Sequence, residues 1–230
     1  MSLRDYGYYE AHAADVTLGD ITSSDINKQI LQWLRDGDNK FNDSQLINLD
    51  LAPGYSENYR YFGVREGDDL GWLGYFIGKS KHLRELGIIG SPEDEVEEQR
   101  IIHALCDGIA RNQYIQQVGL SRLSNDGFAT IARILGDLTQ LEELHVWRCV
   151  DNDNTLVTLL ESGVILKRLW LHDARVDGLR SIVSSLEELI LSMSNLGNDG
   201  LLTLATALTD CTSMKNCVFV KTTSPWRQQG

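Results

Sequence analysis

A short pattern of apolar residues recurs along the chain, with apolar side chains at its first, fourth and sixth places. Seven copies align, beginning 20 to 37 residues apart, with a mean of 28 over the 168 residues that separate the first copy from the last. This spacing predicts a repeat that contains one strand and one helix. The copies are Leu46/Leu49/Leu51, Leu83/Leu86/Ile88, Ile115/Val118/Leu120, Leu141/Leu144/Val146, Leu166/Leu169/Leu171, Leu186/Leu189/Leu191 and, more weakly, Met214/Cys217/Phe219.

The segments between these triplets predict helices. In residues 95–113, for example, Ile101, Ile102, Leu105 and Ile109 fall on one helical face. A serine, a proline and acidic residues precede or begin this segment, which is typical of a helix start. The predicted helices cover residues 70–82, 95–113, 126–138, 154–162, 178–185 and 199–209.

A single strand and a single helix cannot bury their apolar sides alone. Stacking the copies solves this problem, because neighbouring strands then form a parallel sheet whose apolar side chains point toward the helices. Strand–helix–strand connections of this kind are right-handed. The sequence therefore predicts an α/β solenoid, curved, with the parallel sheet on its concave face.

The segment from Leu186 to Leu201 resembles the ribonuclease-inhibitor-like leucine-rich repeat, and the resemblance extends over residues 46–220. Cys149 stands at the place where that family has Asn or Cys, whereas Ser194 occupies the same place in a later copy. The resemblance implies that the side chain at this place satisfies backbone groups of the turn. It concerns the fold more than the function, because the repeated residues are those that the fold requires.

The unequal spacing predicts repeats of different lengths, and the flanking sequences predict how the solenoid begins and ends. The 20-residue copy has room for a short helix or none, and the first two intervals predict insertions such as residues 52–67. We divide the chain into an N-terminal segment, 1–45, with a capping helix at about 24–36, a solenoid of six to seven irregular repeats, 46–222, and a tail, 223–230. No capping helix follows the last strand, which predicts either a longer natural chain or a tail that folds over the end.

Composition narrows the class of protein. The net charge of −12 argues against a nucleic-acid partner, because such binding depends on Lys and Arg. No apolar stretch reaches 18 residues, and the N-terminus lacks a secretory pattern, which favours a cytoplasmic protein that does not enter membranes. The cysteines lack metal-binding spacing and are expected to be free thiols. They are Cys106, Cys149, Cys211 and Cys217.

Sequence motifs for catalysis are absent. There is no glycine-rich phosphate loop, no G-x-S-x-G elbow and no H-E-x-x-H helix, so we predict no enzyme activity and no cofactor. The acidic run from Glu93 to Glu98 is interpreted as a solvated first helical turn rather than a metal site. His82 and His103 are expected to be structural or exposed.

The residues between the apolar places of each strand should point to the concave face, because side chains alternate across a strand. They form three columns. The first is Asn48, Glu85, Gln117, Glu143, Arg168, Glu188, Asn216; the second is Asp50, Gly87, Gly119, His145, Trp170, Ile190, Val218; the third is Ala52, Ile89, Ser121, Trp147, His172, Ser192, Val220.

Two adjacent strands in these columns carry the candidate binding site. His145 should touch Trp170, and Trp147 should touch His172, because neighbouring strands lie about 4.8 Å apart. Exposed Trp and Arg are typical of residues that dominate protein interfaces. Alternatively the aromatic residues pack on one another or are covered by the N-terminal region. The six candidate residues are Glu143, His145, Trp147, Arg168, Trp170 and His172.

A zinc site at His145 and His172 is disfavoured, because the two lie about 7 Å apart on the diagonal and no carboxylate or thiol completes the ligand set. The resemblance implies a non-catalytic module that binds a protein or peptide on the concave sheet, alone or within a larger sensor or adaptor. Regulation of a Ran-type small GTPase and substrate recognition in a ubiquitin ligase are the alternatives. Self-association through the open C-terminal edge is also a hypothesis.

Overall fold

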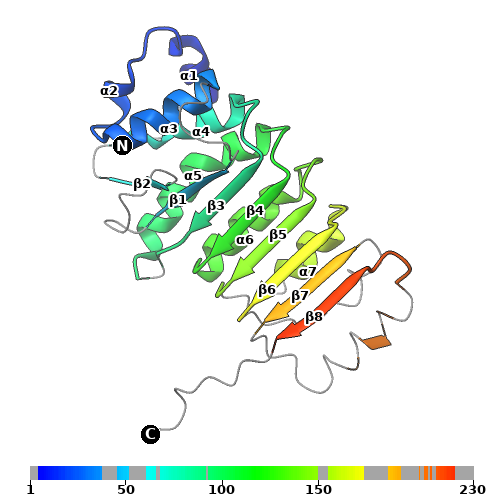
Figure 1. Ribbon diagram of the computed structural model, residues 1–230. Coiled ribbons are helices and arrows are strands. Elements are labelled where there is room, and N and C mark those ends of the chain that lie inside the picture. The colour runs from blue at the N-terminus through cyan, green and yellow to red at the C-terminus, as the bar shows by residue number, and fades with distance from the viewer. Residues whose placement is uncertain are drawn as a thin grey trace, which may run out of the picture.

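The chain folds as one α/β layer pair, with a single open parallel sheet and helices along one of its faces. The computed structural model describes residues 5–37, 46–51, 61–65, 68–91, 93–149, 155–173, 186–192, 202, 205–206, 208 and 211–220. Within these ranges the sheet has eight strands in the order β2-β1-β3-β4-β5-β6-β7-β8. Figure 1 shows the strands side by side, with helices α4 to α7 behind one face and α1 to α3 at the N-terminal end.

The bounds of the elements follow the predicted repeat closely. The helices are α1 (Tyr6–His12), α2 (Leu18–Ile21), α3 (Asp25–Asp36), α4 (Leu70–Lys79), α5 (Glu95–Arg111), α6 (Asn125–Leu135) and α7 (Thr155–Glu161). The strands are β1 (Leu46–Asp50), β2 (Tyr61–Gly63), β3 (Glu85–Ile89), β4 (Gln117–Ser121), β5 (Glu143–Trp147), β6 (Arg168–His172), β7 (Glu188–Ser192) and β8 (Asn216–Val220).

The core lies between the sheet and the helices, and the repeated leucines form it. In β6, Leu169 and Leu171 are buried while Arg168 and Trp170 are exposed, so the strand alternates between its two faces. Leu144, Leu169 and Leu189 are fully buried and lie next to one another across three strands. The apolar triplets therefore point toward the helices as predicted in β3 to β7, whereas Leu46 of the first triplet takes the register position of Glu85 and Phe219 of the last triplet is exposed. We call the opposite face of the sheet the open face.

The register of β3 to β8 agrees with the predicted columns, but β1 does not. Asn48 pairs with Gly87 instead of Glu85, and Asp50 pairs with Ile89 instead of Gly87. The first strand is thus displaced by two residues from the predicted alignment. A two-residue shift keeps Leu49 and Leu51 inward, so alternation alone could not detect it, but it moves Leu46 to the register position of Glu85 and buries Ile47.

The first long insertion contains a strand that the sequence did not predict. Its residues 61–63 form β2, which pairs with the outer side of β1 and so becomes the N-terminal edge of the sheet. Phe62 is fully buried in the core. Helix α3 contacts β2, and the side-chain amide of Asn27 donates to the Gly63 carbonyl at 2.9 Å. The N-terminal helix therefore covers this edge.

Glycines allow an unusually close approach between two helices of the layer. A Cβ at Gly108 in α5 would lie 1.8 Å from the carbonyl oxygen of Gly74 in α4, so a larger residue cannot fit there. A Cβ at Gly71 would meet the ring of Tyr9 in α1. Glycine thus sets the α4–α5 distance and receives the N-terminal helix on the outer side of the layer.

Several predictions lie outside the described residues. They are the helix at 178–185, most of the helix at 199–209, the place of Ser194 and the tail 223–230. The insertion is described only in part, because residues 52–60 and 66–67 are outside these ranges. No helix within the described ranges is both long enough and apolar enough to span a bilayer.

Candidate functional site

Four aromatic side chains lie together on the open face, contributed by β5 and β6. The His145 and Trp170 rings are stacked, with centroids 4.3 Å apart and planes 5° from parallel. The Trp147 and His172 rings meet edge to face at 4.8 Å. Both predicted contacts are therefore present. We call these four residues the aromatic patch.

Both tryptophans of the patch are exposed although they stand within strands. Trp147 exposes 53% of its surface and Trp170 exposes 39%. The reason is the alternation of faces, because Val146 and Leu171, which neighbour them in the chain, are buried toward the helices. Within the described ranges, no part of the N-terminal segment buries these two rings.

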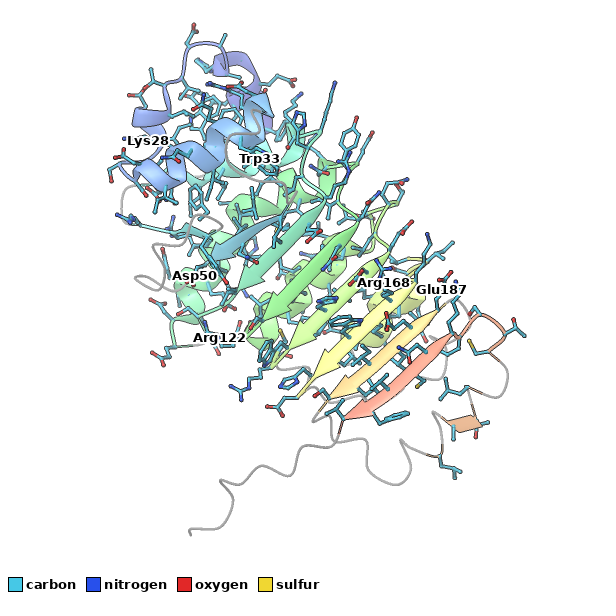
Figure 2. The ribbon with its side chains drawn as sticks, in the orientation of Figure 1. Lys28, Trp33, Asp50, Arg122, Arg168 and Glu187 are labelled. Atoms are coloured by element: carbon cyan, nitrogen blue, oxygen red, sulfur yellow. The ribbon has the colours of Figure 1, made fainter. Side chains whose placement is uncertain are left out.

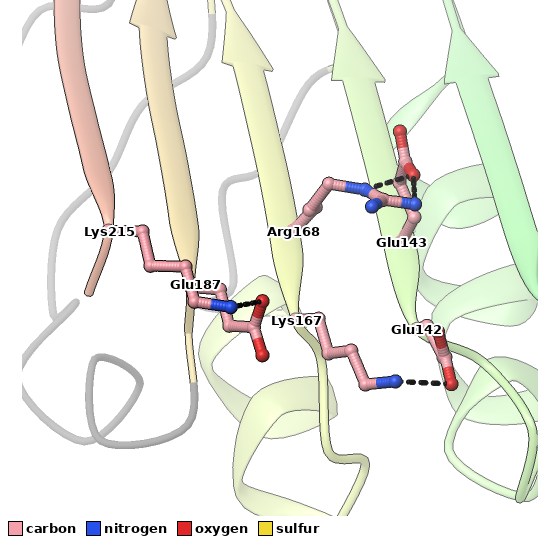
Figure 3. Close-up of polar contacts among 6 residues, drawn as sticks. All are labelled: Glu142, Glu143, Lys167, Arg168, Glu187 and Lys215. Atoms are coloured by element: carbon pink, nitrogen blue, oxygen red, sulfur yellow. Dashed lines mark hydrogen bonds and ion pairs between the residues drawn. The ribbon is translucent and has the colours of Figure 1, made fainter. Parts of the chain in front are cut away.

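A buried carboxylate anchors the patch at one end. Glu143, which is almost fully buried, accepts hydrogen bonds from the Arg168 guanidinium, and its other oxygen lies 2.6 Å from Nε2 of His145. Figure 3 shows the Arg168–Glu143 pair reaching across from β6 to β5. Glu143 thus fixes the His145 ring that stacks on Trp170. Charge-assisted contacts of this kind order side chains more firmly than neutral hydrogen bonds.

Further ion pairs continue along the starts of the same strands. Lys167 contacts Glu142 at 2.7 Å, and Lys215 contacts Glu187 at 2.7 Å, as Figure 3 shows. These side chains are substantially exposed, so each pair contributes little to stability. They neutralise the charge of this margin of the sheet.

Two glycines continue the row of the patch across the open face, and one of them, Gly119, is uncovered. Gly119 on β4 is the register neighbour of His145, and Gly87 on β3 is the neighbour of Gly119. A Cβ placed on Gly119 would have no heavy atom within 4 Å. The patch therefore stands at the border of a flat strip of backbone, bounded on the far side by Asn48, whose side chain reaches over Gly87.

Arginines follow the carboxyl ends of the strands nearest Trp147. Arg122, Arg148 and Asp173 occupy the same place after β4, β5 and β6, and all three have left-handed backbones, with φ of 54°, 52° and 51°. Such values are uncommon for residues other than glycine. The amide of Arg122 donates to the Trp147 carbonyl at 2.9 Å, so this turn is tied directly to the patch. Sequence patterns gave no sign of this row.

The next residue after these turns contributes to the core instead. Cys149 is buried, and its thiol donates to the Trp147 carbonyl at 3.7 Å. Burial raises the pKa of the Cys149 thiol to about 12, so it remains protonated. Its contact with turn backbone is the role that the repeat resemblance implied for this place.

One interpretation of the acidic run was wrong. Glu98 is fully buried rather than solvated, and its carboxylate accepts from the Ser91 amide at 2.9 Å and from the Ser124 amide at 3.0 Å. The Ser124 hydroxyl also donates to it and caps α6. Glu98 therefore joins the turns of two successive units. Charge patterning missed it because α5 presents different faces at successive positions, which a run of letters does not show.

No family model matches the chain, and no curated protein matches it. Among solved structures, actin-binding site 2 of leiomodin-1 is similar at a TM-score of 0.46 and 12% sequence identity, over 82% of this chain and 90% of that one. Within the described residues no three His, Cys, Asp or Glu side chains gather in a way that could hold a metal ion.

Proposed function

We propose that the chain is a ribonuclease-inhibitor-like leucine-rich-repeat solenoid that binds a protein or peptide on the open face of its sheet. The repeat assignment is supported by the seven apolar triplets in the sequence, by the burial of those in β3 to β7 under the parallel sheet and by Cys149 at its expected place. The open face then corresponds to the concave face of such solenoids. The proposed role is binding without catalysis.

The exposed pair Trp147 and Trp170 carries this proposal. Two large apolar rings exposed at diagonal positions of adjacent strands are unfavourable in water, and aromatic anchors of this kind dominate protein interfaces once a partner buries them. Their orientation is also fixed in advance, because His145 and His172 contact them and Glu143 fixes His145. A preordered patch loses less entropy when a partner covers it.

We also propose that the protein is located in the cytoplasm. All four cysteines are free thiols, although disulfides form readily in oxidising compartments. The net charge of −12 supports a protein or peptide partner over a nucleic acid.

The test is affinity capture with the intact protein as bait, compared with a Trp147→Ala/Trp170→Ala bait. A partner of the patch is recovered by the first bait and lost from the second. With that partner purified, each single substitution should weaken binding by about 2 kcal/mol or more, roughly 30-fold in Kd, measured by biolayer interferometry.

Val96→Ala is the matched control, because Val96 is an exposed apolar residue of α5, away from the open face, and its removal should leave Kd unchanged. Equal binding of all recovered partners to the wild-type protein and to the double variant would contradict the proposed site.

A further inference from the structure

The charges around the aromatic patch differ in sign from those of the chain as a whole. The protein has a net charge of −12, yet three exposed arginines lie on the strands of the patch or directly after strands next to it: Arg122 after β4, Arg148 after β5 and Arg168 in β6. Figure 2 shows Arg122 at the carboxyl end of its strand and Arg168 at the opposite end of β6. The patch therefore has the Arg168–Glu143 pair at one end and the two arginines Arg122 and Arg148 at the other.

The acidic groups near these arginines are mostly engaged. Glu143 is buried and paired with Arg168, so it offers little negative charge to solvent. Asp173 lies 3.5 Å from Arg148, a long contact between two exposed side chains that water screens. Arg122 makes no ion pair within the described residues. The row at the carboxyl ends is therefore positive beside Trp147.

The middle of the open face carries no formal charge. The residues of this middle row are register partners from strand to strand: Asn48, Gly87, Gly119, His145, Trp170, Ile190 and Val218. At the amino-end margin, Glu85 and Glu188 are partly buried, and Glu188 accepts from the Asn216 amide at 2.9 Å. On the carboxyl-end side, Asp50 is buried and Asp173 contacts Arg148, which leaves Arg122 and Arg148 as the exposed cations nearest Trp147.

We infer that the partner segment is an acidic peptide that lies over the glycine strip and the aromatic patch, with its carboxylates toward Arg122 and Arg148. This inference rests on the proposed function and specifies the chemistry of the partner. The flat strip at Gly119 admits a peptide backbone close to the sheet, and the tryptophans supply apolar contact. Arginine can bind carboxylates through two parallel hydrogen bonds, which makes it the suitable cation for this role.

The experiment is selection of a displayed library of random peptides on the intact protein, with removal of peptides that also bind the Trp147→Ala/Trp170→Ala variant. Selected peptides are then synthesised with a fluorescent label, and their Kd is measured by anisotropy. We expect sequences enriched in Asp and Glu. Their binding should weaken as salt is raised, because exposed charge pairs are screened.

Charge reversal provides the second measurement. Arg122→Glu/Arg148→Glu should weaken the acidic peptides about tenfold or more at low salt, and Arg122→Gln/Arg148→Gln should give an intermediate loss. Lys28→Glu/Arg100→Glu is the matched control, because it makes the same change in net charge on α3 and α5 and should leave Kd nearly unchanged. Circular dichroism establishes that each variant remains folded.

The outcomes separate this inference from the proposed function. Trp147-dependent peptides that are neutral or basic, or acidic peptides that bind the charge-reversed variant equally well, overturn the acidic partner and leave the binding patch standing. A library that yields no peptide dependent on the tryptophans, or self-association of the protein through this face in sedimentation, overturns the inference together with the open peptide site.

Discussion

Two groups of aromatic residues occupy opposite sides of the molecule and meet opposite environments. In the helix layer, Trp72 of α4 exposes only 4% of its surface and contacts the rings of Tyr9 and Tyr75 at centroid distances of 5.0 and 5.6 Å. On the sheet, Trp147 contacts one ring and exposes 53%. The same residue type is a core component in one place and surface in the other.

The difference shows that the burial of a side chain depends on the face of the element that carries it, and not on its hydrophobicity alone. Trp72 stands on a helix that is enclosed by α1 on its outer side and by the core on its inner side. Trp147 stands on a strand whose leucine-type neighbours already fill the inner side, so its only available direction is outward. An aromatic residue in that position contributes little to folding and is free to serve recognition.

The largest expected effect is on the buried group. Trp72→Ala should lower the free energy of unfolding by about 3–5 kcal/mol, because it leaves a cavity where the N-terminal helix meets the layer. Denaturant unfolding followed by circular dichroism measures this loss. Trp72→Phe, which keeps most of the volume, should lose less. A loss below about 1 kcal/mol for the alanine variant would show that α1 does not enclose this residue.

A somewhat smaller effect is expected in the leucine layer beneath the patch. Leu144→Ala should cost about 2–5 kcal/mol in unfolding free energy, and Leu169→Ala a similar amount, since both side chains are fully buried. The same denaturant titration applies. If either substitution proved neutral, the inward direction of the apolar triplets, and with it the outward direction of the tryptophans, would be wrong.

Glu98 tests the connection between successive units. Glu98→Ala removes the acceptor of the Ser91 and Ser124 amides, and leaving such buried donors without a partner should cost about 1–3 kcal/mol. Glu97→Ala is the control, because Glu97 is exposed and pairs only with Arg100 on the surface; its cost should stay within about 0.5 kcal/mol. Equal stability of the two variants would restore the view of Glu98 as a solvated residue.

The patch itself should hardly matter for stability. Trp147→Ala and Trp170→Ala should each change the unfolding free energy by about 0.5 kcal/mol or less, because both rings are exposed in the folded protein. The contrast with Trp72→Ala, measured in the same buffer, is the decisive quantity. A loss comparable to that of Trp72 would mean that the rings are covered and would remove the candidate site.

The last prediction concerns the reactivity of a thiol, that of Cys149, where we expect almost no reaction in the folded protein. Because its buried thiol has a pKa of about 12, compared with an ordinary value of 9.0, the thiolate fraction at pH 8 is about one in ten thousand. Cys149 should therefore resist iodoacetamide in the native protein, as peptide mass spectrometry can show, and react once the protein is unfolded. The raised pKa also means that any stabilising effect of the neutral thiol is complete below pH 9 and declines above it. Rapid native labelling would contradict its burial.

Much of the fold could be predicted because the repeat imposes one rule many times. Strands β3 to β8 and the contacts of His145 with Trp170 and of Trp147 with His172 follow once the inward positions are fixed. At β1 the actual register differs from the prediction by two residues, which still leaves Leu49 and Leu51 buried, so the apolar pattern did not reveal the difference. The extra strand β2 lies in an insertion that obeys no repeat, so only its partners in three dimensions reveal it.

The candidate site likewise contains residues that the repeat predicts and residues that it does not. Its strand residues could be placed from periodicity, whereas Arg122 and Arg148 occupy left-handed turn positions, where their backbone amides donate to the carbonyls of Trp147 and His172. No period predicts the direction of a turn side chain. Gly119 was visible in the sequence, but its effect depends on the empty space above it, which is a property of the assembled sheet.

The covered N-terminal edge has a consequence for how the sheet can grow. Backbone groups on an exposed edge strand are a template for adding another strand from a second molecule. At β2 this template is only three residues long, and Asn27 of α3 already holds the carbonyl of Gly63. The N-terminal edge is therefore a poorer template for an added strand than β8, which is the five-residue strand at the other edge of the sheet.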